Sequence, residues 1–167
     1  AGLANGACPE LWNDTHAGVV RGIHRGFFAA GSDIVETNTF GGSRLKLNEY
    51  QLGDRTRELN VKGAGLARSV APPTGYVAGS IGPTSRLPAE YEPLGDTTDE
   101  EYLATFREQA AALAEAGVDL FAVETMMFPQ EAVAAVRACK AVADLPVMAT
   151  MFFQYEELHD RDRTMWG

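Results

Sequence analysis

One unit of sequence occurs twice in the chain, and this repeat limits the possible folds more than any other feature. "AAGSDIVETNTF" at 29–40 and "EAGVDLFAVETMMF" at 115–128 both read as the end of a helix, a glycine, an aspartate, an apolar strand and then Glu-Thr. Strands that alternate with helices in this way pair in parallel, through right-handed crossover connections. The repeat therefore predicts an α/β fold built by repetition, either a barrel or a doubly wound sheet.

Hydrophobic periodicity places four strands and the helices between them. The strands are expected at 33–40, 76–82, 118–126 and 146–153, each next to the following one. The helices are expected at 16–30 with Thr15 as its cap, at 44–70 with a break near Gly53, at 98–116 and at 129–142. A complete barrel of eight such units needs about 250 residues, whereas the chain has 167. The sequence therefore predicts part of a (β/α)8 barrel, with four parallel strands and with helices on the outer face of the sheet.

The segment 84–98 is long for a connection between a strand and a helix, which usually has about 2–6 residues. Its two prolines and Gly95 disfavour regular structure. Because the segment directly follows a strand, we expect a mobile or lid-like loop over the strand ends. The polar tail at 154–167 is expected to be irregular.

Composition narrows the possible partners and the compartment. Fourteen basic residues against 23 acidic ones give a formal net charge of -9, which argues against nucleic acid, because its binding needs a basic face. No apolar run approaches the ~20 residues of a membrane span, and no signal-peptide pattern opens the chain. Two isolated cysteines without a secretion signal fit a reducing cytosol. We therefore expect one cytoplasmic domain, residues 1–167, without nucleic-acid or membrane partners.

Polar side chains stand at the carboxyl ends of the predicted strands, where parallel α/β proteins carry their chemistry. They are Glu36, Thr37, Asn38 and Thr39 in the first strand, Ser80 in the second, where it follows Gly79, and Glu124 in the third. Because side chains alternate along a strand, Glu36 and Glu124 each stand above an apolar stack. This predicts a polar pocket for a small polar ligand, in which the carboxylates can hold an ammonium group, bind a metal or act as a general base. The alternative is that each carboxylate pairs with a structural Arg or Lys.

The cysteines and histidines show no local spacing that is typical of a metal site. Cys139 lies on an apolar helix stripe and is expected to be a core thiol. Cys8 precedes Pro9 in an N-terminal loop, where it can be exposed. His24 is expected to be a surface histidine or one with satisfied hydrogen bonds.

Five blocks of sequence run through nearly the whole chain in an order that one known family shares. They are "CPELWN" at 8–13, "AGSDIVETNTFGGSRLKL" at 30–47, "YVAGSIGPT" at 76–84, "GVDLFAVETM" at 117–126 and "LPVMATMFF" at 145–153. Together these blocks resemble the homocysteine S-methyltransferase family. The resemblance implies a (β/α)8 barrel whose first strand precedes Ala1 and whose last three units follow Gly167.

The resemblance also implies an activity and its cofactors. Members of the family use zinc, held by three cysteines in the second half of the barrel, to bind homocysteine sulfur as a thiolate. The thiolate attacks the methyl group of methylcobalamin or of another activated donor, and the product is methionine. The zinc ligands are therefore expected outside this chain, cobalamin is expected on another module or protein, and the isolated chain is expected to be inactive.

The roles that the resemblance implies fall on the strand-end residues. Glu124 matches the glutamate that takes the amino group of homocysteine. Five further residues match segments that line the same cavity: Gly79, Ser80, Thr37, Asn38 and Thr39. Glu36 also matches the family, without an assigned role.

Two other classes of function are compatible with a partial barrel. The first is a half-barrel without catalytic activity that acts as a scaffold or binds a partner. The second is an aldolase-like or lyase-like enzyme in which Glu36 or Glu124 is the base. That enzyme would need a lysine at a strand end, and the predicted strand ends carry none.

Overall fold

Four parallel strands form a single sheet in the computed structural model, which describes residues 2–91 and 93–153. The strands are β1 Ile34–Glu36, β2 Tyr76–Ile81, β3 Leu120–Met126 and β4 Val147–Met151. They are hydrogen-bonded in the order β1-β2-β3-β4, with every pair parallel. The predicted α/β architecture, strand order and strand direction are therefore confirmed. The predicted tail at 154–167 lies outside the described residues.

The first strand is much shorter than its sequence suggests. Its ladder with β2 ends where Glu36 pairs with Ala78, and the backbone then turns, because the Thr39 N–H donates to the Thr37 carbonyl at 2.9 Å. The polar residues after Glu36 therefore belong to a turn rather than to a strand. The expected strand at 33–40 is wrong in its second half.

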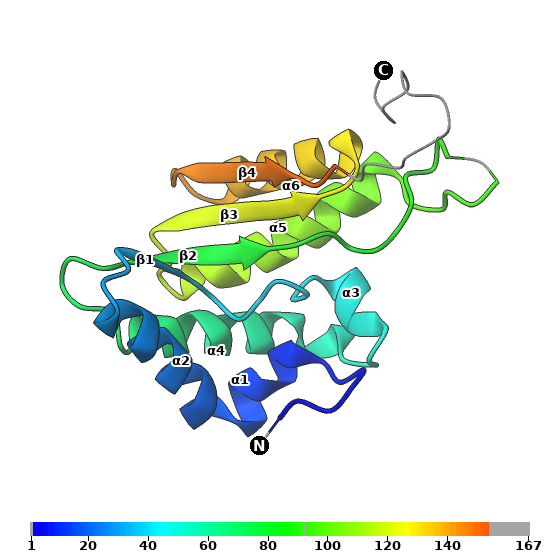
Figure 1. Cartoon of the computed structure of the whole chain (residues 1–167). Helices are drawn as coiled ribbons and strands as arrows, with labels where there is room; N and C mark the ends of the chain where they lie inside the picture. Colours follow the sequence, from blue (N-terminus) through cyan, green and yellow to red (C-terminus); the bar gives the residue numbers. More distant parts are fainter. Residues whose placement is uncertain (1, 92, 154–167) are drawn as a thin grey trace, which may run out of the picture.

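Four longer helices alternate with the strands: α2 Ala17–Ala29, α4 Thr56–Arg68, α5 Asp99–Glu115 and α6 Pro129–Val142. Shorter turns of helix fill the connections: η1 Pro9–Leu11, α1 Trp12–Thr15, α3 Arg44–Asn48 and η2 Gly53–Arg55. Figure 1 shows α5 and α6 behind the sheet, with α2 beyond the edge at β1. No helix within residues 2–91 and 93–153 is both long and apolar enough to cross a membrane.

The helix ends test the expected caps. Thr98 caps α5 in a reciprocal capping box with Glu101, as the sequence Thr-x-x-Glu favours. The break near Gly53 is confirmed, since η2 separates α3 from α4. The expected cap of α2 is wrong, because the Thr15 hydroxyl donates to the Leu11 carbonyl and His16 occupies the cap position.

The hydrophobic core lies between the sheet and helices α4, α5 and α6. Val77, Phe121 and Val123 point from the strands into this layer, and Cys139 of α6 is fully buried in it, as expected of a core thiol. The other face of the sheet is open, with Tyr76 and Met148 exposed. Since side chains alternate along a strand, the polar residues on the open face stand beside these apolar ones.

The loop at 84–98 emerges at the carboxyl end of β2, as expected, and within its described residues has only an isolated bridge between Pro88 and Thr97. It packs against α6: the Tyr91 ring meets the Phe128 ring edge-on at 5.1 Å. At its start, the backbone N–H and the hydroxyl of Thr84 donate to Glu131 Oε1 at 2.7 and 2.6 Å. The mobility of this loop stays a prediction.

Burial makes Glu131 a pH-sensitive anchor for this loop. The residue is 1 % exposed, and burial raises the pKa of its carboxyl group, although the Thr84 bonds oppose the shift. The folded protein therefore holds a proton that the unfolded chain releases above a pH of about 4.3. Stability should fall as the pH rises from there through the raised pKa of Glu131.

Replacing Glu131→Gln removes this titration and keeps the oxygen that accepts from Thr84. We expect the free energy of unfolding of the variant to fall less steeply than that of the unchanged protein above pH 4.3. Each pKa unit of the shift corresponds to about 1.4 kcal/mol. Urea unfolding of the barrel domain that contains this chain, from pH 4.5 to 8, measures the difference. Parallel pH profiles would contradict the assignment.

Candidate functional site

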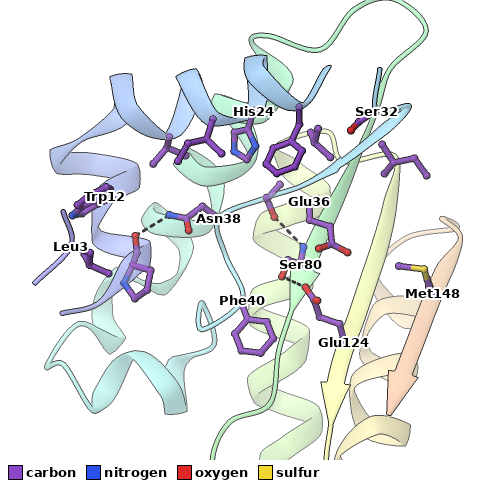
Figure 2. Close-up of a pocket in the computed structure, with 17 residues that line it drawn as sticks. Leu3, Trp12, His24, Ser32, Glu36, Asn38, Phe40, Ser80, Glu124 and Met148 are labelled. Carbon is purple, nitrogen blue, oxygen red and sulfur yellow. Dashed lines mark hydrogen bonds between the residues drawn. The ribbon is translucent and has the colours of Figure 1, made fainter. Parts of the chain in front are cut away.

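A cavity of about 700 Å³ runs along the exposed side of β1, from Ser32 before this strand to the carboxyl ends of β1, β2 and β3. Helix α2 forms an apolar wall with Val20, Ile23 and Phe27. The polar residues on its other side come from the ends of three strands: Glu36, Thr37, Asn38, Ser80 and Glu124. Figure 2 shows Glu36, Ser80 and Glu124 converging on one space. No described residue of the 84–98 loop lines the cavity, so its expected role as a lid has no support here.

Ser80 and Glu124 form the centre of this polar side. The Ser80 hydroxyl donates to Glu124 Oε1 at 2.6 Å, from β2 to β3 (Figure 2). Within residues 2–91 and 93–153, Glu124 makes no other side-chain hydrogen bond and no ion pair. The second carboxylate oxygen is therefore available to a ligand. The expectation that Glu124 lies beside Ser80 is confirmed as geometry.

Glu36 adds a second carboxylate to the same space. Burial, and after it the charge of Glu124, raise the pKa of Glu36. Among the described residues no Lys or Arg pairs with either carboxylate, so the alternative of structural ion pairs is not realised there. Two neighbouring carboxylates without a countercharge attract a cation. An ammonium group suits this place, because it carries a positive charge and can donate a hydrogen bond to each carboxylate.

A β-bulge directly follows Glu124 near the end of β3. The register with β4 shifts between Val123 and Met126, and Thr125 has a φ of 60°, a genuine outlier for a β-branched residue. The extra residue lets Met126 return to the core beside Val123, while Glu124 faces the cavity. Thr150 supports the bulge, because its hydroxyl accepts from the Thr125 N–H at 3.1 Å. The regular alternation assumed for this strand did not reveal the bulge.

Thr37 and Thr39 are both buried at the end of β1; Thr37 lines the back of the cavity, whereas Thr39 is not among the lining residues. They are 4 % and 0 % exposed, and their hydroxyl groups bond to each other at 2.6 Å. Both also bond to the main chain of Ser80. The two threonines therefore hold the main chain of Ser80, whose side chain lines the cavity.

Asn38 lines the cavity, as expected, but its amide group is directed away from Glu124, and Gly79 is not among the lining residues. Asn38 Nδ2 donates to the Pro9 carbonyl and to Asn13 Oδ1, both at 2.9 Å, and Figure 2 shows this amide directed away from Glu124. Its amide group therefore holds the N-terminal segment against the end of β1. A Cβ on Gly79 would lie 3.1 Å from the side chain of Leu113, so this glycine faces α5.

His24 is a residue of the pocket that the sequence did not indicate. It lies on α2, buried, with its Nε2 atom unpartnered among the described residues. Burial lowers the pKa of His24 and so favours the neutral form of its ring. The expectation of a surface or fully satisfied histidine is wrong, because α2 turns this position toward the strand end (Figure 2).

The residues that the structure describes do not fit a zinc site. Burial, followed by the bond to Glu10, raises the pKa of Cys8 to about 11, and burial raises the pKa of Cys139 to about 12. Cys8 is 4 % exposed, so its expected exposure is wrong. Its thiol donates to Glu10 Oε2 at 3.1 Å. Within residues 2–91 and 93–153, no three His, Cys, Asp or Glu side chains are grouped so that they could hold a metal.

Comparison with known proteins identifies the family. The family model described as Homocysteine S-methyltransferase matches residues 3–165, so the chain belongs to the homocysteine S-methyltransferase family. The methionine synthases of Mycobacterium tuberculosis (strain ATCC 25618 / H37Rv) and Mycobacterium leprae (strain TN) are 40% and 38% identical to it over 124 residues. Each match covers 71% of this chain and 10% of the relative, so the chain matches about a tenth of their length.

Solved structures agree on the fold. The Escherichia coli homocysteine methyltransferase MmuM, in its metallated form, superposes with a TM-score of 0.75 at 22% identity, over 92% of this chain and 58% of that chain. The oxidized form gives 0.72 at 24% identity, over 90% and 56%. The predicted partial barrel is confirmed. The assignment of residues 1–167 to one domain, and the strand expected before Ala1, stay predictions.

The two carboxylates give a test of the geometry alone. In Glu124→Gln, the pKa of Glu36 should fall because one of its two causes is gone, and it should stay above its usual value because burial remains. Carbon-13 NMR titration of labelled glutamate carboxyl groups measures this pKa. The exposed Glu100 on α5 provides a control, since Glu100→Gln should leave Glu36 unchanged. An unshifted Glu36 in Glu124→Gln would mean that the carboxylates are too far apart to interact.

Proposed function

We propose that this chain is the part of a homocysteine S-methyltransferase that binds the amino-acid end of homocysteine, which the complete enzyme methylates to methionine. The observation that carries the proposal is the Ser80–Glu124 pair beside Glu36, at the carboxyl ends of neighbouring parallel strands, without a cationic partner among the described residues. Membership of the family and the similarity to methionine synthases support the choice of substrate.

The role of each residue follows from its geometry. Glu124 accepts a hydrogen bond from the ammonium group of the substrate through the oxygen that Ser80 does not use. Ser80 keeps the Glu124 carboxylate in one orientation, because its hydroxyl occupies the other oxygen. Glu36 adds negative charge to the same space and strengthens the attraction for a cation.

The remaining chemistry lies outside this chain in the proposal. MmuM was solved in a metallated form, yet the described residues do not fit a metal. We therefore propose that zinc is held by residues other than those described, and that cobalamin, where it is the methyl donor, is held by another module. The contribution of this chain is to bind and orient the amino group.

Replacing Glu124→Gln in the complete protein tests the proposal. The substitution removes the charge and keeps the shape, and a hydrogen bond to a charged group contributes about 1.5–3 kcal/mol. Homocysteine binding should therefore weaken by roughly 10- to 150-fold, with the metal content unchanged. Isothermal titration calorimetry measures the affinity, and metal analysis the content.

Glu100→Gln is the matched control, because it makes the same change on the exposed first turn of α5. It should bind homocysteine like the unchanged protein. Unaltered affinity in Glu124→Gln would show that the amino group is bound elsewhere. A loss of metal in Glu124→Gln would show that this carboxylate serves the metal instead.

A further inference from the structure

The main chain of Ser80 lies where its neighbouring strand has ended. Beyond the paired residues of β1 and β2, the Thr37 N–H donates to the Ala78 carbonyl at 2.9 Å, and the main chains next meet where the Gly82 N–H donates to the Phe40 carbonyl at 2.9 Å. In a parallel ladder, residues two apart direct their N–H and C=O groups toward the same neighbour. Ser80 therefore directs both groups toward a backbone that has turned away, and buried groups of this kind need partners.

Two side-chain hydroxyl groups take the place of the main-chain partners that Ser80 lacks on this side. The Ser80 N–H donates to Thr37 Oγ1 at 3.0 Å. The Thr39 hydroxyl donates to the Ser80 carbonyl at 2.7 Å. The two hydroxyl oxygens are 2.6 Å apart. Both polar groups of the Ser80 main chain are thus satisfied by threonine side chains.

The donor and the acceptor of each hydrogen bond in this ring follow from the number of protons that are available. Thr39 has one hydroxyl proton, and the Ser80 carbonyl can only accept, so that proton lies between them. The bond between the two hydroxyl groups must then use the proton of Thr37. The result is a closed ring in which Ser80 N–H donates to Thr37, Thr37 donates to Thr39, and Thr39 donates to Ser80. Neither hydroxyl has a proton left for a ligand.

A fully buried amide supports the ring from the helical side. Gln109 Nε2, on α5, donates to the Thr39 carbonyl at 2.8 Å and lies 3.4 Å from the Ser80 carbonyl. It also donates to Asn60 Oδ1 of α4 at 3.2 Å. Asn60 in turn donates to the Gly42 carbonyl at 2.7 Å. The turn that carries both threonines is therefore fixed to two helices.

We propose that Thr37 and Thr39 are positioning residues: their hydroxyl ring fixes the Ser80 main chain and so aims the Ser80 hydroxyl at Glu124. This inference rests on the proposed function of the Ser80–Glu124 pair and explains why two buried threonines adjoin a polar pocket. They act on substrate only through Ser80. Their effect should therefore disappear when the Ser80 hydroxyl is absent.

A double-mutant cycle in the complete protein tests this dependence. Thr37→Val keeps the shape, removes the acceptor of the Ser80 N–H, and should weaken homocysteine binding about tenfold. In a Ser80→Ala background, the same substitution should cause no further loss. The KM for the methyl donor should not change. Thr37→Ser keeps the hydroxyl group and should restore most of the affinity.

Each outcome decides the proposal. An equal loss in the presence and absence of the Ser80 hydroxyl would overturn it, as would unchanged binding in Thr37→Val. If Thr37→Val does not fold, Thr39→Val takes its place in the double-mutant cycle with Ser80→Ala, because it breaks the ring at the Ser80 carbonyl. If neither valine variant folds, the ring serves folding and the proposal is wrong. Glu124→Gln separates a failure of the proposed function from a failure of the positioning role of the threonines. Unaltered homocysteine binding in Glu124→Gln would reject the proposed function itself.

Discussion

The register of β2 against β3 determines where the polar groups of the pocket lie. Ser80 is opposite Ala122, and Glu124 is the next residue of β3 on the same face of the sheet. Because the two strands run in parallel, their carboxyl ends coincide, and a short hydroxyl group can reach the carboxylate of the neighbouring strand at 2.6 Å. A shift of one residue would turn Glu124 toward the core helices and leave the pocket without its central group.

The pocket brings two carboxylates close together, and their repulsion destabilises the protein when no cation is bound. Burial and, after it, the charge of Glu124 disfavour the ionised form of Glu36. A bound ammonium group relieves the repulsion. The β-branched residue in left-handed conformation at Thr125 adds backbone strain directly beside Glu124. Strain and unpaired charge thus occur together at the place where the ligand is proposed to bind.

Much of the fold is encoded locally, and that part could be predicted. The repeated helix–Gly–Asp–strand unit indicates parallel strands in sequential order, and the period of two places Glu124 and Ser80 on the open face.

The turn after Glu36 could not be predicted, because it depends on hydroxyl groups that bond to another strand. The period of two fails there, so Thr37 and Thr39 become buried and Asn38 turns toward the N-terminal segment. Gly79 was placed in the cavity by the family resemblance alone, whereas strand alternation turns it away from the face of Ser80 and toward Leu113. Cys8 and His24 were misplaced because their burial depends on packing between distant segments.

The central claim is that the strand-end carboxylates recognise the ammonium group of the substrate, and one binding comparison tests it directly. Calorimetry on the unchanged complete protein would compare homocysteine with 4-mercaptobutanoate, which keeps the thiol and the carboxylate and lacks the amino group. A hydrogen bond to a charged group contributes about 1.5–3 kcal/mol. The amino group should therefore improve the affinity by roughly 10- to 150-fold. Equal affinity for the two compounds would contradict the account, because the pocket of Ser80, Glu124 and Glu36 would then have no part in recognising the substrate.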